Sequence, residues 1–340
     1  MDIEFHYYIT YLTATRAGLT TSDAETLAYS SQYVDENTRY LDIDQNKSTA
    51  YQNYITQTMN ILKPTDVLMR IYPIFHFIPG DPLSPTAQRK DGKLHQLNTT
   101  PNSENANLIF DAAIESGDLY RIGIAAHSYV DTWAHQNFVG YYDAFNGMSG
   151  LLSRALPNIG HADAKHKPDW PALIWQDCRL TQATVDNKQR FLEAAVHLFR
   201  KLRRYADPGC SHAQMVQDEE QLMADLTNAI GDIDQTNQYQ SVRIQRYCRL
   251  SEQVNYGGRR LPLFDSRLWF RQAIDHQVRG ISDDVTLLSK INPWKDKYRW
   301  RDGYKNSHWY KFQESAKAQQ KSAWEILKER SFRGLALMNL

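Results

Sequence analysis

Three residues with metal-binding side chains recur at every fourth position in one segment: His127, Asp131 and His135. Four residues advance a helix by about 400°, so the three side chains project from nearly one face. Successive members lie about 6 Å apart along the axis, and the two histidines about 12 Å apart. Because zinc bonds to histidine and carboxylate are about 2 Å long, neighbours can share an ion, whereas the two histidines should hold different ions. The spacing predicts at least two ions in a row, with Asp131 between them and able to bridge.

Histidines and carboxylates elsewhere in the chain could complete such a cluster. His76 lies in the apolar run 71–79, where a buried imidazole needs a metal or a carboxylate as its partner. Taken singly, each of these residues is more often structural, but together they have the composition that a zinc cluster needs. The candidate metal ligands are His6, Asp35, His76, His127, Asp131, His135, His161, Asp163 and His166.

The elements that must position these residues are predicted to be helices. Apolar spacing, capping residues and breakers indicate helices at about 5–17, 22–35, 51–62, 104–116, 119–137, 186–205, 214–230, 237–252, 266–279 and 307–328. No run of alternating β-branched residues is long enough to build a sheet. We therefore expect an all-α fold with long ordered loops and a single domain over residues 1–340. Its metal-site half would cover about 1–170 and its helical C-terminal half about 171–340.

Composition limits the partners and the location. Lys plus Arg and Asp plus Glu both number 39, so the chain lacks the basic excess of a duplex-DNA or anionic-membrane binder. No stretch approaches 18 apolar residues, and the first residues lack a secretory signal. The expected location is cytoplasmic by default, with signal-independent secretion as the alternative. The three cysteines are far apart, which favours reduced thiols over a cysteine zinc site.

The order of the candidate ligands resembles that of the bacterial zinc-dependent phospholipases C and the fungal single-strand-specific zinc nucleases. That family supplies its ligands in the chain order shown here by His6, Asp35, His76, His127, Asp131, His135 and His161. Segments 4–8 and 33–37 also look like an uncharacterised bacterial and fungal branch of this superfamily. The likeness covers about residues 1–170. It implies an all-α fold and a three-zinc site.

The resemblance also implies a role for each ligand. One pair of ions would use Asp35, His76, His127 and a bridging Asp131. The other ion would use His135, His161 and either Asp163 or His166.

The sequence departs from the family pattern at three points. Three residues separate Asp131 from His135, where the family has five. Lys165 stands where the family has a carboxylate, so Asp163 or His166 must substitute. The family also uses the amino group and carbonyl of a processed N-terminal Trp, whereas this chain begins Met-Asp. One zinc is therefore expected to be bound differently or to be absent.

We therefore expect a hydrolase in which a metal-activated water attacks a phosphodiester, with Asp35 orienting or deprotonating that water. The cofactor would be two or three zinc ions, although other divalent metals fit. Lipid head groups, single-stranded nucleic acids and small phosphoesters all remain as substrates, and the sequence does not specify an oligomeric state. The alternative is a helical binding or toxin-like protein with a structural metal site. An HD-type phosphohydrolase is disfavoured because Asp follows none of the eleven histidines.

Overall fold

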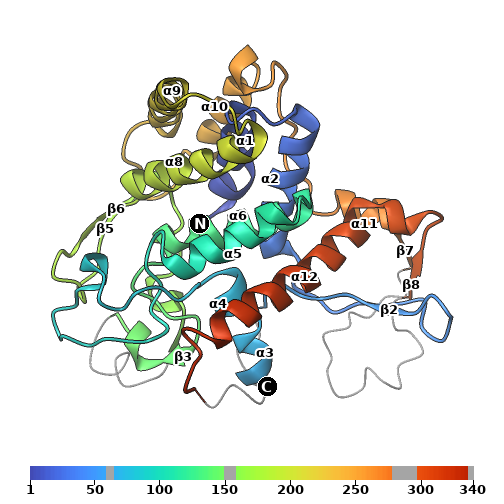
Figure 1. Cartoon of the computed structure of the whole chain (residues 1–340), viewed down its shortest axis with the longest axis horizontal. Helices are drawn as coiled ribbons and strands as arrows, with labels where there is room; N and C mark the ends of the chain where they lie inside the picture. The colour runs from blue at the N-terminus through green and yellow to red at the C-terminus, as the bar shows by residue number, and fades with distance from the viewer. Residues whose placement is uncertain (59–64, 149–157, 278–296, 336–340) are drawn as a thin grey trace.

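The helix that carries the histidine–aspartate pattern, α6 (Leu119–Ala134), lies at the centre of the fold (Figure 1). The computed structural model describes residues 1–58, 65–148, 158–277 and 297–335. Among the described residues, most of the packing against α6 comes from α2 (Thr21–Glu36), α5 (Glu104–Glu115), α8 (Asn187–Ala206) and α12 (His308–Lys328). Because α8 and α12 come from the second half of the chain, both halves enclose the segment that carries the candidate ligands.

Local sequence explains the bounds and the burial of α6. The Asp118 side chain accepts hydrogen bonds from the first free amides of the helix, as a good N-cap residue does. Every residue from Ile122 to Ala134 is buried. A Cβ at Gly123 would lie 2.4 Å from the Leu27 carbonyl oxygen, so this glycine lets the backbones of α2 and α6 approach closely. The helix ends before His135, three residues earlier than the apolar spacing predicts.

The remaining helical segments are shorter or peripheral. They are the π-helix η1 (Glu4–Ile9), α1 (Thr10–Arg16), α3 (Thr65–Met69), α4 (Tyr72–Phe75), α9 (His212–Ile230), α10 (Gln240–Leu250) and α11 (Leu268–Ala273). Single 3-10 turns are η2 (Pro85–Ala87), η3 (Ala144–Asn146), η4 (Ala162–Ala164), η5 (Val254–Tyr256) and η6 (Tyr304–Asn306). No helix within the described ranges is long and apolar enough to cross a membrane.

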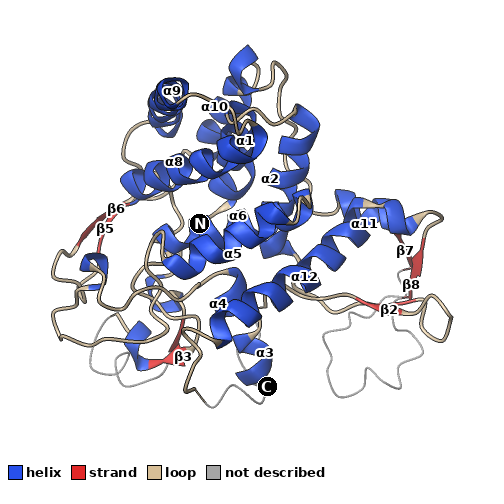
Figure 2. Cartoon of the chain, in the orientation of Figure 1, coloured by secondary structure: helices blue, strands red, loops and turns tan. Residues whose placement is uncertain are grey.

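The prediction of an all-α fold is wrong, because the described residues form eight strands in three small sheets. The strands are β1 (Asp42–Ile43), β2 (Tyr51–Gln52), β3 (Tyr142–Asp143), β4 (Asn158–Ile159), β5 (Ile174–Gln176), β6 (Thr184–Asp186), β7 (Ile274–Gln277) and β8 (Lys297–Trp300). The largest sheet has the order β2-β1-β8-β7, with β1 and β8 parallel. β3 pairs with β4 and β5 with β6. Figure 2 shows the strands at the edges of the helical body, so the fold is mixed α/β around a helical centre.

Two helix predictions fail where chain segments pair with distant partners. The segment predicted as a helix at 51–62 begins as strand β2, and residues 53–58 are not helical; 59–62 lie outside the described residues. The Asn53 side chain accepts from the Leu41 amide and donates to the Arg39 carbonyl, which holds this segment beside β1. The helix predicted at 266–279 ends as α11 at Ala273, where the chain continues as β7.

Candidate metal centre

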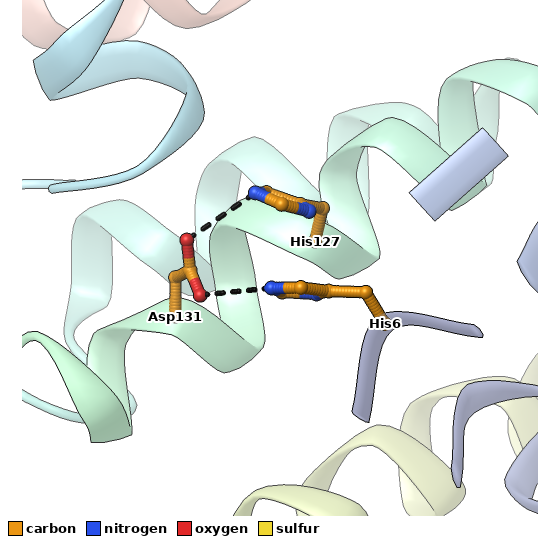
Figure 3. Close-up of side chains that lie close together, drawn as sticks. All are labelled: His6, His127 and Asp131. Carbon is orange, nitrogen blue, oxygen red and sulfur yellow. Dashed lines mark ion pairs between the residues drawn. The ribbon is translucent and has the colours of Figure 1, made fainter. Parts of the chain in front are cut away.

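Asp131 on α6 presents its two carboxylate oxygens to two different histidine rings (Figure 3). The Nε2 atom of His6, on η1, lies 3.2 Å from Oδ1. The Nε2 atom of His127, one turn earlier on α6, lies 3.3 Å from Oδ2. The two rings stack with their centroids 3.8 Å apart. One buried carboxylate is therefore placed to bridge two cations.

Potential ligand atoms gather in three groups around this carboxylate. Within each group, the atoms all lie within 4.8 Å of one another, a separation that one ion could span. The groups are His6, His127 and Asp131; Asp35, His76 and His127; and His135, His161 and Asp169. The fold thus brings the three regularly spaced residues His127, Asp131 and His135 together with side chains from distant parts of the chain, namely His6, Asp35, His76 and His161.

In the second group, His76 and His127 point ring nitrogens that carry lone pairs toward each other. The Nδ1 atom of His127 lies 2.8 Å from the Ser31 carbonyl oxygen, and Nε2 of His76 lies 2.9 Å from the Thr56 carbonyl oxygen. A carbonyl only accepts, so these ring nitrogens carry the protons. In the neutral rings, the opposite nitrogens carry lone pairs, and they lie 3.1 Å apart. A shared cation, or an added proton, would relieve this repulsion.

The third group is built in the same way. The Nδ1 atom of His135 donates to the His76 carbonyl oxygen at 2.8 Å, and Nδ1 of His161 donates to the Lys165 carbonyl oxygen at 2.8 Å. The Nε2 atoms of these two rings therefore carry lone pairs and lie 3.3 and 3.6 Å from Oδ1 of Asp169. A second-shell carbonyl that fixes the tautomer of each ring is characteristic of metal-binding histidines.

His6 enters the site from the π-helix η1, and the C-terminal half of the chain anchors this helix. Glu4, in η1, accepts two hydrogen bonds of 2.9 Å from the buried guanidinium of Arg243 on α10. Arg243 also donates to Asp234 at 2.8 Å. Single π turns occur often at functional sites. The second half of the chain, which carries none of the predicted ligands, thus holds the first one in place.

The Met1 nitrogen also reaches the cluster. It lies 2.5 Å from Oδ1 of Asp131 and 3.4 Å from Nε2 of His135. Burial opposes the charge of this amino group, but Asp131 and Asp169 outweigh it and raise its pKa to about 10. The Met1 nitrogen is therefore a further nitrogen atom beside Asp131 and His135.

Burial and charge suit cations at the centre of this cluster. Burial and the neighbouring His127 lower the pKa of His6 to about 4, so its imidazole is neutral at pH 7 and able to ligate a metal. Both ring nitrogens of His6 and Oδ2 of Asp131 are buried without a hydrogen-bond partner in the described part of the chain. Burial raises the pKa of Asp131, but His135, the Met1 amino group and His127 more than offset this and hold it well below its usual value. Unpartnered polar atoms at this depth are costly, and divalent cations would satisfy them.

Because the pKa of His6 is depressed in the folded protein, we expect the metal-free protein to lose stability as the pH falls below 6.5. The pKa of His6 is about 4 in the folded protein against an ordinary value of 6.5, so its contribution is present above 6.5 and disappears toward 4. Between pH 6.5 and 5 the loss should reach about 2 kcal/mol. Urea unfolding in chelator should show a decline shallower by about this amount in His6→Asn. Parallel declines in the two proteins would contradict the assignment.

Asp163 and His166, offered by the sequence as alternatives for one ligand, belong to none of the three groups. Both are exposed; the Asp163 carboxylate accepts from the Met148 amide at 3.3 Å, and the His166 ring stacks on Trp170. The buried Asp169 stands in their place beside His161, because the loop after η4 turns back toward that ring. The sequence around Asp169 carries no periodic signal that would have identified it.

A cavity of about 700 Å³ is lined by members of all three donor groups. Asp35, His135 and Asp169 line it, and its other walls include the apolar side chains Phe77 and Trp170. Asp35 lies 3.8 Å from Nδ1 of His76 and 3.7 Å from Nε2 of His127. A small organic molecule can therefore reach the donor atoms from solvent.

Comparison with known proteins gives one match. A model described as "Family of unknown function (DUF6765)" matches residues 1–327. No curated protein and no solved structure matches the chain.

Proposed function

Because the chain belongs to DUF6765, a family of unknown function, we propose its role from the site alone: a metal-dependent phosphoester hydrolase that holds two or three divalent ions. One observation carries the proposal. Four histidines direct lone pairs into the cluster, each fixed by a backbone carbonyl, and three aspartates meet them there. Imidazole and carboxylate together suit zinc better than the all-oxygen ligands that magnesium or calcium prefers.

The proposed ions would divide the donors according to the three groups. One ion would be held by Asp35, His76 and His127, and Asp131 would bridge it to a neighbour beside His6. A further ion would be held by His135, His161 and Asp169. The chain order of these donors is also the support for our proposal that DUF6765 is a branch of the zinc-dependent phospholipase C and nuclease superfamily.

The exposure of each carboxylate indicates which of them could act on the attacking water. Bound divalent ions supply Lewis-acid stabilisation of phosphoryl oxygens and lower the pKa of a coordinated water. The side chains of Asp131 and Asp169 are 1% and 12% exposed, whereas Asp35 is 29% exposed and lines the cavity. Asp35 is therefore the carboxylate best placed to orient an attacking water and accept its proton.

Asp35→Asn is expected to lower hydrolysis of bis(p-nitrophenyl) phosphate by about 100-fold or more, because the amide cannot accept a proton at neutral pH. The amide oxygen can still ligate, so the zinc content measured by mass spectrometry should fall by no more than one ion. Asp163→Asn is the matched control: its carboxylate is exposed and outside the three groups, and it should behave as the unmodified protein.

The same experiment tests the rival interpretation. A binding or toxin-like protein with a structural metal site would contain zinc but hydrolyse no phosphodiester before any substitution. Its Asp35→Asn variant would change in melting temperature alone. Hydrolysis that persists in Asp35→Asn would rule out the proposed role of this carboxylate.

A further inference from the structure

Lys165, which lines the cavity of about 700 Å³, adopts a backbone conformation that favours glycine. Its φ is 56° and its ψ is −132°, a combination that non-glycine residues rarely adopt. In this conformation both backbone groups of Lys165 form hydrogen bonds. The Lys165 amide donates to the Ala162 carbonyl, and the Lys165 carbonyl accepts from Nδ1 of His161 at 2.8 Å. Glycine could make both bonds with less strain, so the presence of lysine points to a use of the side chain.

The surroundings of Lys165 indicate what that use is. The residue is exposed, it lines the cavity, and no carboxylate among the described residues forms an ion pair with its ammonium. Its carbonyl bonds the outward nitrogen of His161, so Lys165 stands behind that ring and outside the donor groups. Phe77 and Trp170 contribute apolar walls to the same cavity. Lys165 lines the same cavity as Asp35, His135 and Asp169, so a substrate that fills this cavity would bring an ester group beside Lys165.

We propose that Lys165 selects phosphodiesters in which an ester group carries a negative charge, and disfavours those with a cationic group such as a quaternary ammonium. This inference rests on the proposed hydrolase function and narrows its substrate class. An exposed ammonium in a cavity with low-dielectric walls should raise kcat/KM for an anionic ester about tenfold over a neutral ester. It should lower kcat/KM for a cationic ester by a similar factor.

Three p-nitrophenyl phosphodiesters of similar size test the selection. Their second ester groups are 2-carboxyethyl, 3,3-dimethylbutyl and choline, which are anionic, neutral and cationic. The unmodified protein should prefer them in that order. Lys165→Arg should keep the order, Lys165→Met should abolish it, and Lys165→Glu should reverse it. A uniform loss on all three esters would overturn the inference, because Lys165 would then act on the reacting phosphoryl group.

An equilibrium measurement separates this inference from the hydrolase proposal. Calorimetry would compare 3-phosphonopropionate with 3-methylbutylphosphonate, which carries an uncharged isopropyl group in place of the carboxylate, on the zinc-loaded protein. The carboxylate should bind about tenfold more tightly, and Lys165→Met should remove the difference while zinc content stays the same. If no ester is hydrolysed, the hydrolase proposal fails, and the binding comparison still decides the role of Lys165. Equal affinities in the unmodified protein would overturn it.

Lys165→Gly separates the side chain from the backbone. Relief of the positive-φ strain should raise the melting temperature by about 1–2 °C, while charge selection is lost as in Lys165→Met. If Lys165 had a purely structural role, Lys165→Gly would not raise the melting temperature, and both Lys165→Gly and Lys165→Met would keep the charge selection.

Discussion

Replacing Asp131 by asparagine should remove at least one zinc ion and lower phosphodiester hydrolysis on the order of 1,000-fold or more. Oδ1 of Asp131 faces His6 and the Met1 nitrogen, and Oδ2 lies 3.3 Å from His127 and 3.5 Å from His76. Asparagine keeps the volume but replaces one oxygen by an amide NH2, which only donates. The variant thus loses one side of the bridge and one negative charge between the proposed ions.

Mass spectrometry of bound zinc and assays with bis(p-nitrophenyl) phosphate measure the two effects of Asp131→Asn. Ser128→Ala is the matched control on the same helix. Ser128 is buried, and within the described part of the chain it bonds only to backbone carbonyls of α6 and belongs to no donor group. It should keep the full zinc content. An Asp131→Asn protein with unchanged zinc and unchanged turnover would exclude the bridging role.

The part of the site that sequence predicts best is the part with local geometry. His127 and Asp131 share a face because both lie on α6 at helical spacing, and His135, the C-cap residue of that helix, lies 3.5 Å from Asp131. Asp169 is different, because its place beside His161 depends on the path of the loop that contains Lys165. A turn that depends on one positive φ leaves no periodic pattern in the sequence, so the sequence indicates only Asp163 and His166, which lie nearer to His161 along the chain.

The fold shows the same division between local and distant interactions. The long amphipathic helices α8 and α12 begin and end close to their predicted bounds, since capping and apolar spacing are local signals. Strands of two to four residues are too short to show alternation, and β1 pairs with β8 from near the other end of the chain. The expected all-α architecture fails at these edges and not in the centre. The candidate ligands Asp35, His127 and Asp131 lie on helices that local signals predict.

Removal of zinc should lower the melting temperature by roughly 10 °C. Each ion present at about 1,000 times its Kd contributes about 4 kcal/mol, and two ions contribute about 8 kcal/mol. In a chain of 340 residues, 1 kcal/mol corresponds to about 1–2 °C. The large effect follows from the position of the donors, because His6, His127 and Asp131 are at most 1% exposed and water cannot replace a lost cation.

Calorimetric melting before and after dialysis against a chelator measures this shift. Zinc added back should restore the melting temperature, whereas magnesium should not, because imidazole-rich sites bind magnesium poorly. Asp131→Asn supplies the control, since a protein that has already lost a bridged ion should respond to chelation by a smaller shift. An equal melting temperature with and without chelator would mean that the converging lone pairs are satisfied without a metal, and the geometric basis of the proposed function would fail with it.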